Sequence, residues 1–445
     1  MEEIEKNKKH NLRLFPLYKM MSWDLLFFYA ISFLFLTEVK GFSTAEILFA
    51  DAFYPLFKAI LQIPCTILID RIGKRNSLVI ANTSVSMFVL LTIGCNSIIV
   101  LILANLFNAF GFVIKSTAEP NILYEALSKG PNRRTIFSKK DGFCGALFYY
   151  FDAITSIAAG FLFVINPYYP LILCLIMTVL STILSYAFRI IPVDTTSSEL
   201  DSSGEDVPSQ NNLSIFRHIF NYFKKLFSGF RYIFRSSRLR SLILFNGLFA
   251  SFITIMVTIR RSLLTDIHFT SEQFGITFAV LGILSGLSSS KSLVFHRKLK
   301  NKVLTYLGLY FVFSVIICGL IVLLDMPYNI MLTIMLIMLG IQYILKGPYY
   351  TLIKQYLLNF SSSNMRINIY SANTFIEGAI SAGMSFLAAY MLTHMSSAYV
   401  AVMLGCTTFI VMIFLLDYMR YKVGLKPEEY KPKEINIDIQ NKEQK

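Results

Sequence analysis

Two carboxyl groups lie inside long apolar runs of this sequence, where a charged group needs either a partner or a function. They belong to Asp152 and Glu377. A charge at the centre of a bilayer costs roughly 3 kcal/mol on insertion scales. A carboxyl group in apolar surroundings can be neutralised by a proton, so these two acids are the predicted proton carriers. The alternative is that each carboxylate is held in an ion pair by Lys58, Lys115 or Lys346.

Other polar side chains recur at helical spacing within the same runs. Steps of three, four and four residues place Asp51, Tyr54, Lys58 and Gln62 on one face of a helix. Lys58 can meet an anionic or carbonyl group of a solute, or it can pair with an acid such as Asp51 or Asp152. The predicted cavity-lining residues are Asp51, Tyr54, Lys58, Gln62, Asn105, Asn108, Tyr149 and Asn373.

The composition indicates which environment positions these side chains. Of the 445 residues, 55% are apolar and only 15% are charged, whereas a soluble domain carries roughly 25% charged residues. An ordinary soluble enzyme is therefore excluded, and a polytopic helical membrane protein is indicated. The twelve predicted spans cover about 20–38, 46–69, 77–94, 97–117, 142–165, 168–191, 240–259, 273–293, 303–324, 328–350, 370–392 and 396–417.

The basic residues predict the orientation of these spans. All but four of the 41 Lys and Arg residues lie in or beside the two tails and the even-numbered connections. Positive residues stay on the cytoplasmic side, so both termini are predicted to be cytoplasmic. The exceptions are Lys40, Lys58, Arg260 and Arg261. We interpret the two arginines as interfacial anchors or an external vestibule, and Asp24 as an interfacial residue of the first span.

The chain divides into two halves that echo each other. Residues 1–192 and 240–420 each form a predicted bundle of six helices. The connection 193–239 contains a basic amphipathic helix at 215–235, and 421–445 form a cytoplasmic tail. The second span is entered by Phe42-Ser43-Thr44-Ala45-Glu46 and the eighth by Phe269-Thr270-Ser271-Glu272. Such ordered echoes indicate duplication of a six-helix unit, as in many transporters.

The loop after the second span carries the sequence Asp70-Arg71-Ile72-Gly73-Lys74-Arg75. It is similar to the signature Gly-x-x-x-Asp-Arg-x-Gly-Arg-Lys of the major facilitator superfamily, although Thr66 replaces the leading glycine. The resemblance implies two bundles that rock around a mid-membrane site, with Asp70 clasping them on the cytoplasmic side. The predicted cytoplasmic gate consists of Asp70, Arg71, Gly73, Lys74, Arg75, Lys115, Glu119, Arg133, Lys346 and Arg366.

These features predict a secondary transporter of a small organic solute, coupled to protons and embedded as a monomer in the lipid of a bacterial plasma membrane. Efflux of an amphiphilic compound is the expectation from fold-level analogy. The intramembrane lysines favour an organic anion as the alternative solute, taken up or exported. An alternative of another class is a sensor or assembly partner that transports nothing.

Enzymatic activity is not predicted. The sequence has no G-x-x-x-x-G-K-[ST] loop for phosphates, no H-E-x-x-H zinc helix and no G-x-S-x-G nucleophile motif. Its six cysteines are scattered and form no C-x-x-C pair. We therefore expect no cofactor, no metal ion and no nucleic-acid partner.

Overall fold

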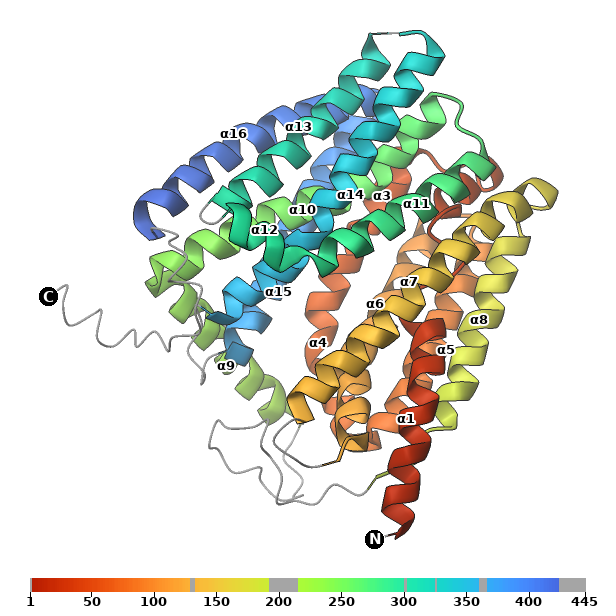
Figure 1. Ribbon diagram of the computed structural model, residues 1–445, viewed down its shortest axis with the longest axis vertical. Coiled ribbons are helices and arrows are strands. Elements are labelled where there is room, and N and C mark those ends of the chain that lie inside the picture. The colour runs from red at the N-terminus through yellow and green to blue at the C-terminus, as the bar shows by residue number, and fades with distance from the viewer. Residues whose placement is uncertain are drawn as a thin grey trace, which may run out of the picture. The chain divides into compact units, whose positions relative to one another are not determined.

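Helices form the whole of the ordered secondary structure in the computed structural model, which describes residues 2–128, 133–191, 215–299, 302–324, 326–359 and 366–423 (Figure 1). The all-helical prediction is confirmed for these ranges. The helices are α1 (Glu2–Ser22), α2 (Ser32–Leu34), the π-helix η1 (Phe35–Val39), α3 (Thr44–Asp51), α4 (Phe53–Ile72), α5 (Lys74–Gly94), α6 (Ile98–Ala126), α7 (Arg133–Ile165), α8 (Tyr169–Tyr186), α9 (Ile215–Arg235), α10 (Ser237–Asp266), α11 (Ser271–Ser290), α12 (Ser292–Leu299), α13 (Val303–Leu323), α14 (Tyr328–Asn359), α15 (Arg366–Leu392) and α16 (Ser397–Val423).

Ten helices in the described ranges are long and apolar enough to cross a membrane: α5, α6, α7, α8, α10, α11, α13, α14, α15 and α16. They coincide with the predicted third to twelfth spans. The stretches Thr44–Gln62 and Pro64–Ile72 would together make an eleventh span, bent by 51°. Proline explains a bend at this place, because it has no backbone N–H and its ring clashes with the preceding turn. The predicted amphipathic helix at 215–235 is α9.

The predicted first span, 20–38, is not one continuous helix. α1 ends at Ser22, and regular helix returns only at Ser32. In between, the Asp24 carboxylate accepts a hydrogen bond from the backbone N–H of Leu25 at 2.9 Å, which competes with helical pairing. Phe27 adopts φ +62°, a left-handed conformation that a side chain of this size rarely takes. A single helix over the predicted first span is therefore not found, and the count of twelve spans stays a prediction.

The chain separates into two compact units. Residues 1–197 group with 264–283 in the first unit, and residues 198–263 group with 284–445 in the second. The beginning of α11 thus belongs to the first unit by its contacts. The predicted domain boundaries at residues 192 and 240 stay a prediction.

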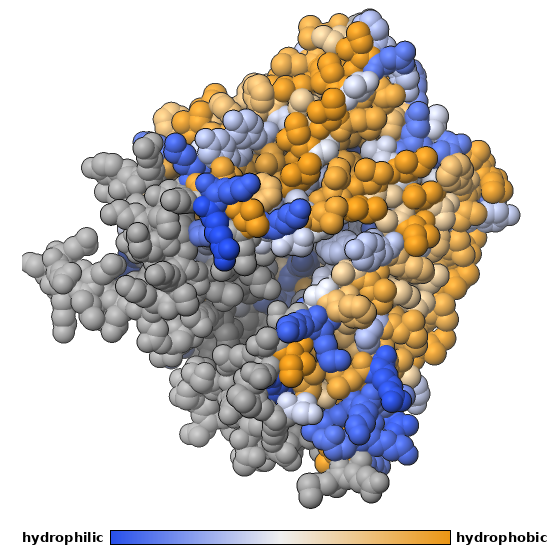
Figure 2. Space-filling view, in the orientation of Figure 1, coloured by the Kyte–Doolittle hydropathy of each residue, from blue (hydrophilic) through white to orange (hydrophobic). Residues whose placement is uncertain are grey.

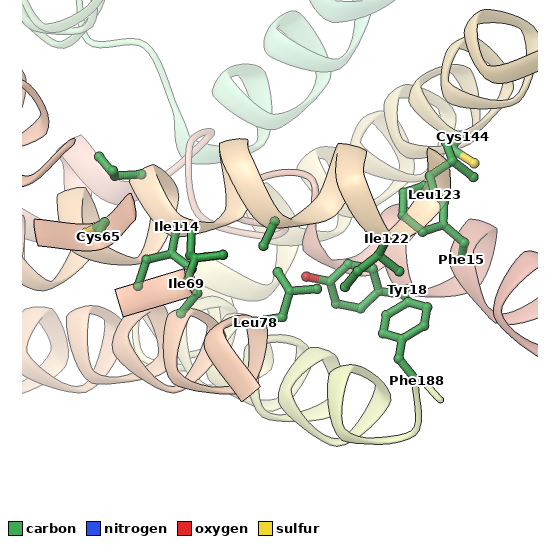
Figure 3. Close-up of a cluster of buried hydrophobic side chains, with 13 residues drawn as sticks. Phe15, Tyr18, Cys65, Ile69, Leu78, Ile114, Ile122, Leu123, Cys144 and Phe188 are labelled. Atoms are coloured by element: carbon green, nitrogen blue, oxygen red, sulfur yellow. The ribbon is translucent and has the colours of Figure 1, made fainter. Parts of the chain in front are cut away.

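The core of the first unit lies where α1 meets α6, α7 and α8. Figure 3 shows Tyr18 of α1 beside Phe188, with Leu78 and Ile122 close by. The rings of Tyr18 and Phe188 meet edge to face, with centroids 5.1 Å apart. Asn11 of α1 also exchanges two hydrogen bonds with the backbone of Arg189, at 2.8 and 2.9 Å. α1 is therefore an integral part of this unit.

In the second unit, α13 packs against α14 and α16. Phe249 of α10 is the centre of an aromatic cluster there. Its ring meets those of Tyr349 and Phe311 edge to face, with centroids 4.6 and 5.4 Å apart. Such pairs contribute about 0.5–1.5 kcal/mol each beyond the burial of their area. The cluster holds α10, α13 and α14 together.

Large apolar side chains cover the outside of several spans. Figure 2 shows this hydrophobic surface over α7 and α8, and separately over α13 and α14. Exposed examples on α7 and α8 include Tyr150, Ile154 and Ile183, each at least 60% accessible. A soluble monomer rarely exposes so large an apolar surface. This surface is suited to contact lipid, as the composition predicts.

The contact between α5 and α6 leaves no room for a side chain at Gly111. A Cβ atom there would lie 2.6 Å from Val85 Cγ2 and 2.7 Å from the carbonyl oxygen of Ala81. We expect Gly111→Ala to destabilise the protein by about 1–3 kcal/mol, because the helix backbones must separate. The apparent unfolding temperature in detergent measures this change.

Gly142→Ala provides the matched control, since a Cβ atom at this exposed helical position meets nothing within 4 Å. It should leave the unfolding temperature unchanged or raise it slightly. Equal effects of the two substitutions would contradict close packing of α5 on α6.

Candidate functional site

A hydrogen-bonded network centred on Glu119 lies inside the first unit. The Glu119 carboxylate forms an ion pair with Lys19 and accepts hydrogen bonds from the hydroxyls of Tyr18 at 2.9 Å and Ser22 at 3.4 Å. Asn82 of α5 donates to the Tyr18 hydroxyl at 3.0 Å. Three helices are thereby joined through one carboxylate. The sequence predicted Glu119 as a gate residue but did not predict its partners.

Lys115, one helical turn before Glu119, is also buried. Its Nζ donates to the backbone carbonyl of Ser22 and lies 4.7 Å from the centroid of the Phe112 ring. Ser22 is the last residue of α1, so this contact satisfies a carbonyl that the interrupted helix leaves unpaired. Lys115 therefore stabilises the break in the first span.

Asp24 lies within that break, among charged and aromatic side chains. Its carboxylate accepts a hydrogen bond from the Tyr29 hydroxyl at 2.8 Å and interacts electrostatically with Lys115 and Lys58. Lys58 Nζ lies 5.5 Å from the centroid of the Tyr54 ring. Asp24 is therefore an acid that interacts with Lys58, in addition to the predicted candidates Asp51 and Asp152. The interfacial interpretation of Asp24 stays a prediction.

Asp152 and Tyr149 lie on α7 near the same acid. Both interact electrostatically with Asp24, and the Tyr149 ring lies 6.4 Å from that of Trp23. Within the described residues, the Asp152 carboxylate has no hydrogen bond and no ion pair; only its backbone carbonyl accepts, from the Thr155 hydroxyl at 3.1 Å. The ion-paired alternative for Asp152 is not found.

The other predicted cavity residues of this unit lie on α3, α4 and α6. Asn105 Nδ2 donates to the carbonyl of Ala50 at 3.0 Å and to the Asp51 carboxylate at 3.4 Å, which brings two predicted residues together. Asn108 is buried, and its Oδ1 has no hydrogen-bond partner among the described residues. Gln62 is half-buried on α4. The structure leaves their role in substrate binding a prediction.

The signature loop is folded around Gly73, whose φ of +81° requires a residue without a Cβ. Lys74 forms an ion pair with Glu125 of α6. Arg75 donates to the carbonyl oxygen of Tyr186 at 3.0 and 2.6 Å and lies over its ring. These residues tie α5 to α6 and to α8 within one unit.

A cavity of about 300 Å³ adjoins the same loop, with Asp70 among its lining residues. Asp70 and Arg71 are exposed at the end of α4. Arg133 donates to the carbonyl oxygen of Tyr124 at 3.2 and 2.5 Å and stacks over that ring. The side chain of Arg366, at the start of α15, lies outside the described part of the chain. The gating role of these residues stays a prediction.

A second buried network lies in the second unit. Asn246 of α10 donates to the Asn373 amide oxygen at 3.3 Å and to the Glu377 carboxylate at 3.1 Å. The Tyr349 hydroxyl donates to Asn246 Oδ1 at 2.8 Å. The two predicted residues on α15 are therefore brought together by Asn246 and Tyr349, which were not among the predicted site residues. A lone asparagine within the apolar run 240–259 was the available signal for Asn246.

Arg260 is buried in the second unit, with only 2% of its surface accessible. Its Nη1 donates to Gln342 Oε1 at 3.1 Å, and its guanidinium carbon lies 5.0 Å from the centroid of the Tyr343 ring. Lys346 Nζ lies 5.5 Å from the same centroid, well inside α14. The interpretation of Arg260 as an interfacial anchor is therefore wrong, because a surface anchor keeps its charge in water.

Glu119 and Glu125 offer a direct test of how burial governs ion pairs here. The Glu119 side chain is 3% accessible and that of Glu125 is 21%. We expect Glu119→Gln to destabilise the protein by about 3–5 kcal/mol, because Lys19 is left charged and buried. Glu125→Gln should cost no more than about 1 kcal/mol. Equal shifts of the unfolding temperature for the two variants would contradict the Glu119 network.

Comparisons with solved structures show what this arrangement of helices is similar to. The nucleoside transporter NupG has a TM-score of 0.68 at 10% identity, covering 94% of this chain and 100% of that one. A D-xylose-proton symporter has a TM-score of 0.64 at 13% identity, covering 97% and 99%. A POT family transporter in complex with 5-aminolevulinic acid has a TM-score of 0.62 at 11% identity, covering 95% and 96%. These identities support the fold alone.

Comparison with curated protein sequences gives no match. The family model of the Major Facilitator Superfamily matches residues 19–366, which is well over half of the chain. The match includes the signature loop and most of the spans, and the structural neighbours are transporters of the same fold. The protein therefore belongs to the major facilitator superfamily and is a membrane transporter, not an enzyme.

Proposed function

We propose that this transporter exports a small amphiphilic organic solute in exchange for protons across the plasma membrane of a bacterium. The observation that carries the proton part is the Asp152 carboxylate, which lies within a span and has no ion pair among the described residues. A charge that is left uncompensated in apolar surroundings is neutralised most simply by binding a proton. Asp152 is therefore the primary proton carrier in this proposal.

Glu377 is the second proton carrier. Unlike Asp152, it accepts a hydrogen bond from Asn246, which is in turn held by Tyr349. A hydrogen bond from a neutral amide orients the carboxyl group. Asn246 can turn its amide oxygen towards a protonated Glu377, since an amide both donates and accepts. The network can therefore hold either protonation state.

The amphiphilic character of the solute is supported by the mixture of side chains around Asp24. Lys58 lies over the Tyr54 ring, and Tyr149 lies next to Trp23. Aromatic rings beside a few charged groups are typical of sites that bind an apolar molecule carrying a polar end. One solved neighbour is named as a proton symporter, so proton coupling is compatible with this fold. The direction of transport rests on fold-level analogy.

An organic anion is the second candidate solute. Arg260 and Lys346 place two cationic groups beside one aromatic ring in the second unit. Two like charges repel each other in apolar surroundings, and a negative group between them relieves that repulsion. An amphiphilic molecule with an acidic end would belong to both candidate classes of solute.

Proteoliposomes with an imposed pH gradient test the proton coupling. Aromatic solutes of one size, carrying a positive, a negative or no charge, are added outside, and proton movement is followed with a pH-sensitive dye. We expect one charge class to dissipate the gradient with the unaltered protein. Asp152→Asn should reduce this flux to the level of protein-free vesicles, because the amide cannot carry a proton.

Asp417→Asn is the matched control, because Asp417 is an exposed carboxylate on α16 outside both networks. It should transport as the unaltered protein does. Full pH-driven flux in the double variant Asp152→Asn/Glu377→Gln would refute proton coupling through these acids. Failure of every solute to cross, together with a co-purifying partner protein, would favour the non-transporting alternative.

A further inference from the structure

We infer that Arg260, with Gln342, Tyr343 and Lys346 around it, binds the carboxylate of a small organic anion. This inference deepens the proposed function and rests on it, because it assigns the chemical class of the transported solute. The four residues come from α10 and α14 of the second unit. They form a group distinct from the Asn246–Glu377 network.

The contacts of the Arg260 guanidinium leave one side unused. Its Nε donates to the backbone carbonyl of Met256 at 2.8 Å, and Nη1 donates to Gln342 Oε1 at 3.1 Å. The third nitrogen, Nη2, is buried and has no hydrogen-bond partner among the described residues. A guanidinium carries two hydrogens on this nitrogen, so two donors await an acceptor.

The positive charge of Arg260 also lacks a counter-ion among the described residues. Within the described residues, the Arg260 side chain has no ion pair. Lys346 lies near the same Tyr343 ring, and both Arg260 and Glu377 interact electrostatically with Tyr350. A buried charge without a counter-ion destabilises a protein. A site that retains such a charge is suited to receive its counter-ion from a ligand.

The surroundings favour a carboxylate over a neutral group. The free N–H groups of Nη2 can donate to a carboxylate oxygen, and hydrogen bonds between charged groups are about twice as strong as neutral ones. Gln342 fixes the guanidinium plane and is itself held by its Nε2 contact with Cys318 Sγ at 3.6 Å. Arginine and lysine together provide the positive field.

Binding to the purified protein in phosphatidylcholine nanodiscs tests the inference without any proton gradient. The probes are benzoate, 2-naphthoate and octanoate, each compared with its neutral amide by calorimetry and by the shift of the unfolding temperature. We expect the carboxylates to bind at least about tenfold more tightly than their amides, as hydrogen bonds to a charged group imply. Arg260→Gln should abolish this preference.

Three further variants separate recognition from structural damage. Arg260→Lys keeps the charge but loses the planar donors, so the preference should fall to an intermediate value. Lys346→Met should weaken carboxylate binding by a smaller factor. Arg240→Gln is the matched control, because Arg240 lies on the same helix but donates to the Tyr418 hydroxyl at 2.6 Å. It should bind the carboxylates as the unaltered protein does.

Several outcomes would overturn the inference. Equal binding of carboxylates and amides by the unaltered protein would show that no anion is recognised. An unchanged preference in Arg260→Gln, with unaltered amide binding, would place recognition elsewhere and leave Arg260 with a structural role, its Nη2 solvated by water. Stabilisation by phosphatidylglycerol that depends on Arg260, without any effect of the soluble carboxylates, would assign the site to a lipid headgroup. The binding measurements use no proton gradient. A failure of proton-driven flux would therefore contradict the proposed proton coupling without contradicting carboxylate binding at Arg260.

Discussion

The low dielectric constant of the membrane interior is the constraint on which the rest of this structure depends. Charged side chains within the spans must be compensated by an ion pair, by hydrogen bonds or by a bound species. Glu119 satisfies this requirement with Lys19, Tyr18 and Ser22. Because these partners lie on α1, the need to compensate one carboxylate also fixes α1 against α6. The contacts that compensate the Glu119 carboxylate are thus also contacts that hold α1 against α6.

The break in the first span follows from the same constraint. Interrupting a helix in a membrane leaves backbone groups unpaired, and each unpaired group costs several kcal/mol. Lys115 donates a hydrogen bond to the carbonyl oxygen of Ser22, and the Asp24 carboxylate accepts one from the N–H of Leu25. The side chains that make the break possible are therefore those of two charged residues, Lys115 and Asp24. In return, the break brings Asp24 close to Lys58 and Asp152.

Hydropathy and charge placement predicted the positions of α5 to α8, of α10 and α11 and of α13 to α16, because each is a long apolar run. The interrupted first span escaped prediction, since an average over residues does not register the local geometry of Asp24 and Phe27. The pairing of Asn373 and Glu377 on one face followed from helical spacing. Their partner Asn246 lies 127 residues from Asn373 in the sequence, and periodicity within one helix carries no information about such distant contacts.

The contrast between Glu119 and Arg260 distinguishes two uses of a buried charge. Glu119 receives donors from several side chains and an ammonium group, so its charge and its lone pairs are satisfied by the protein itself. Arg260 is buried to a similar degree, but its Nη2 has no acceptor within the described residues. A fully compensated charge is an element of architecture, because any ligand would have to compete with partners already in place. An incompletely compensated charge has free energy to gain from a ligand. This difference in compensation, and not burial alone, separates the residues that build this transporter from those proposed to bind its solute.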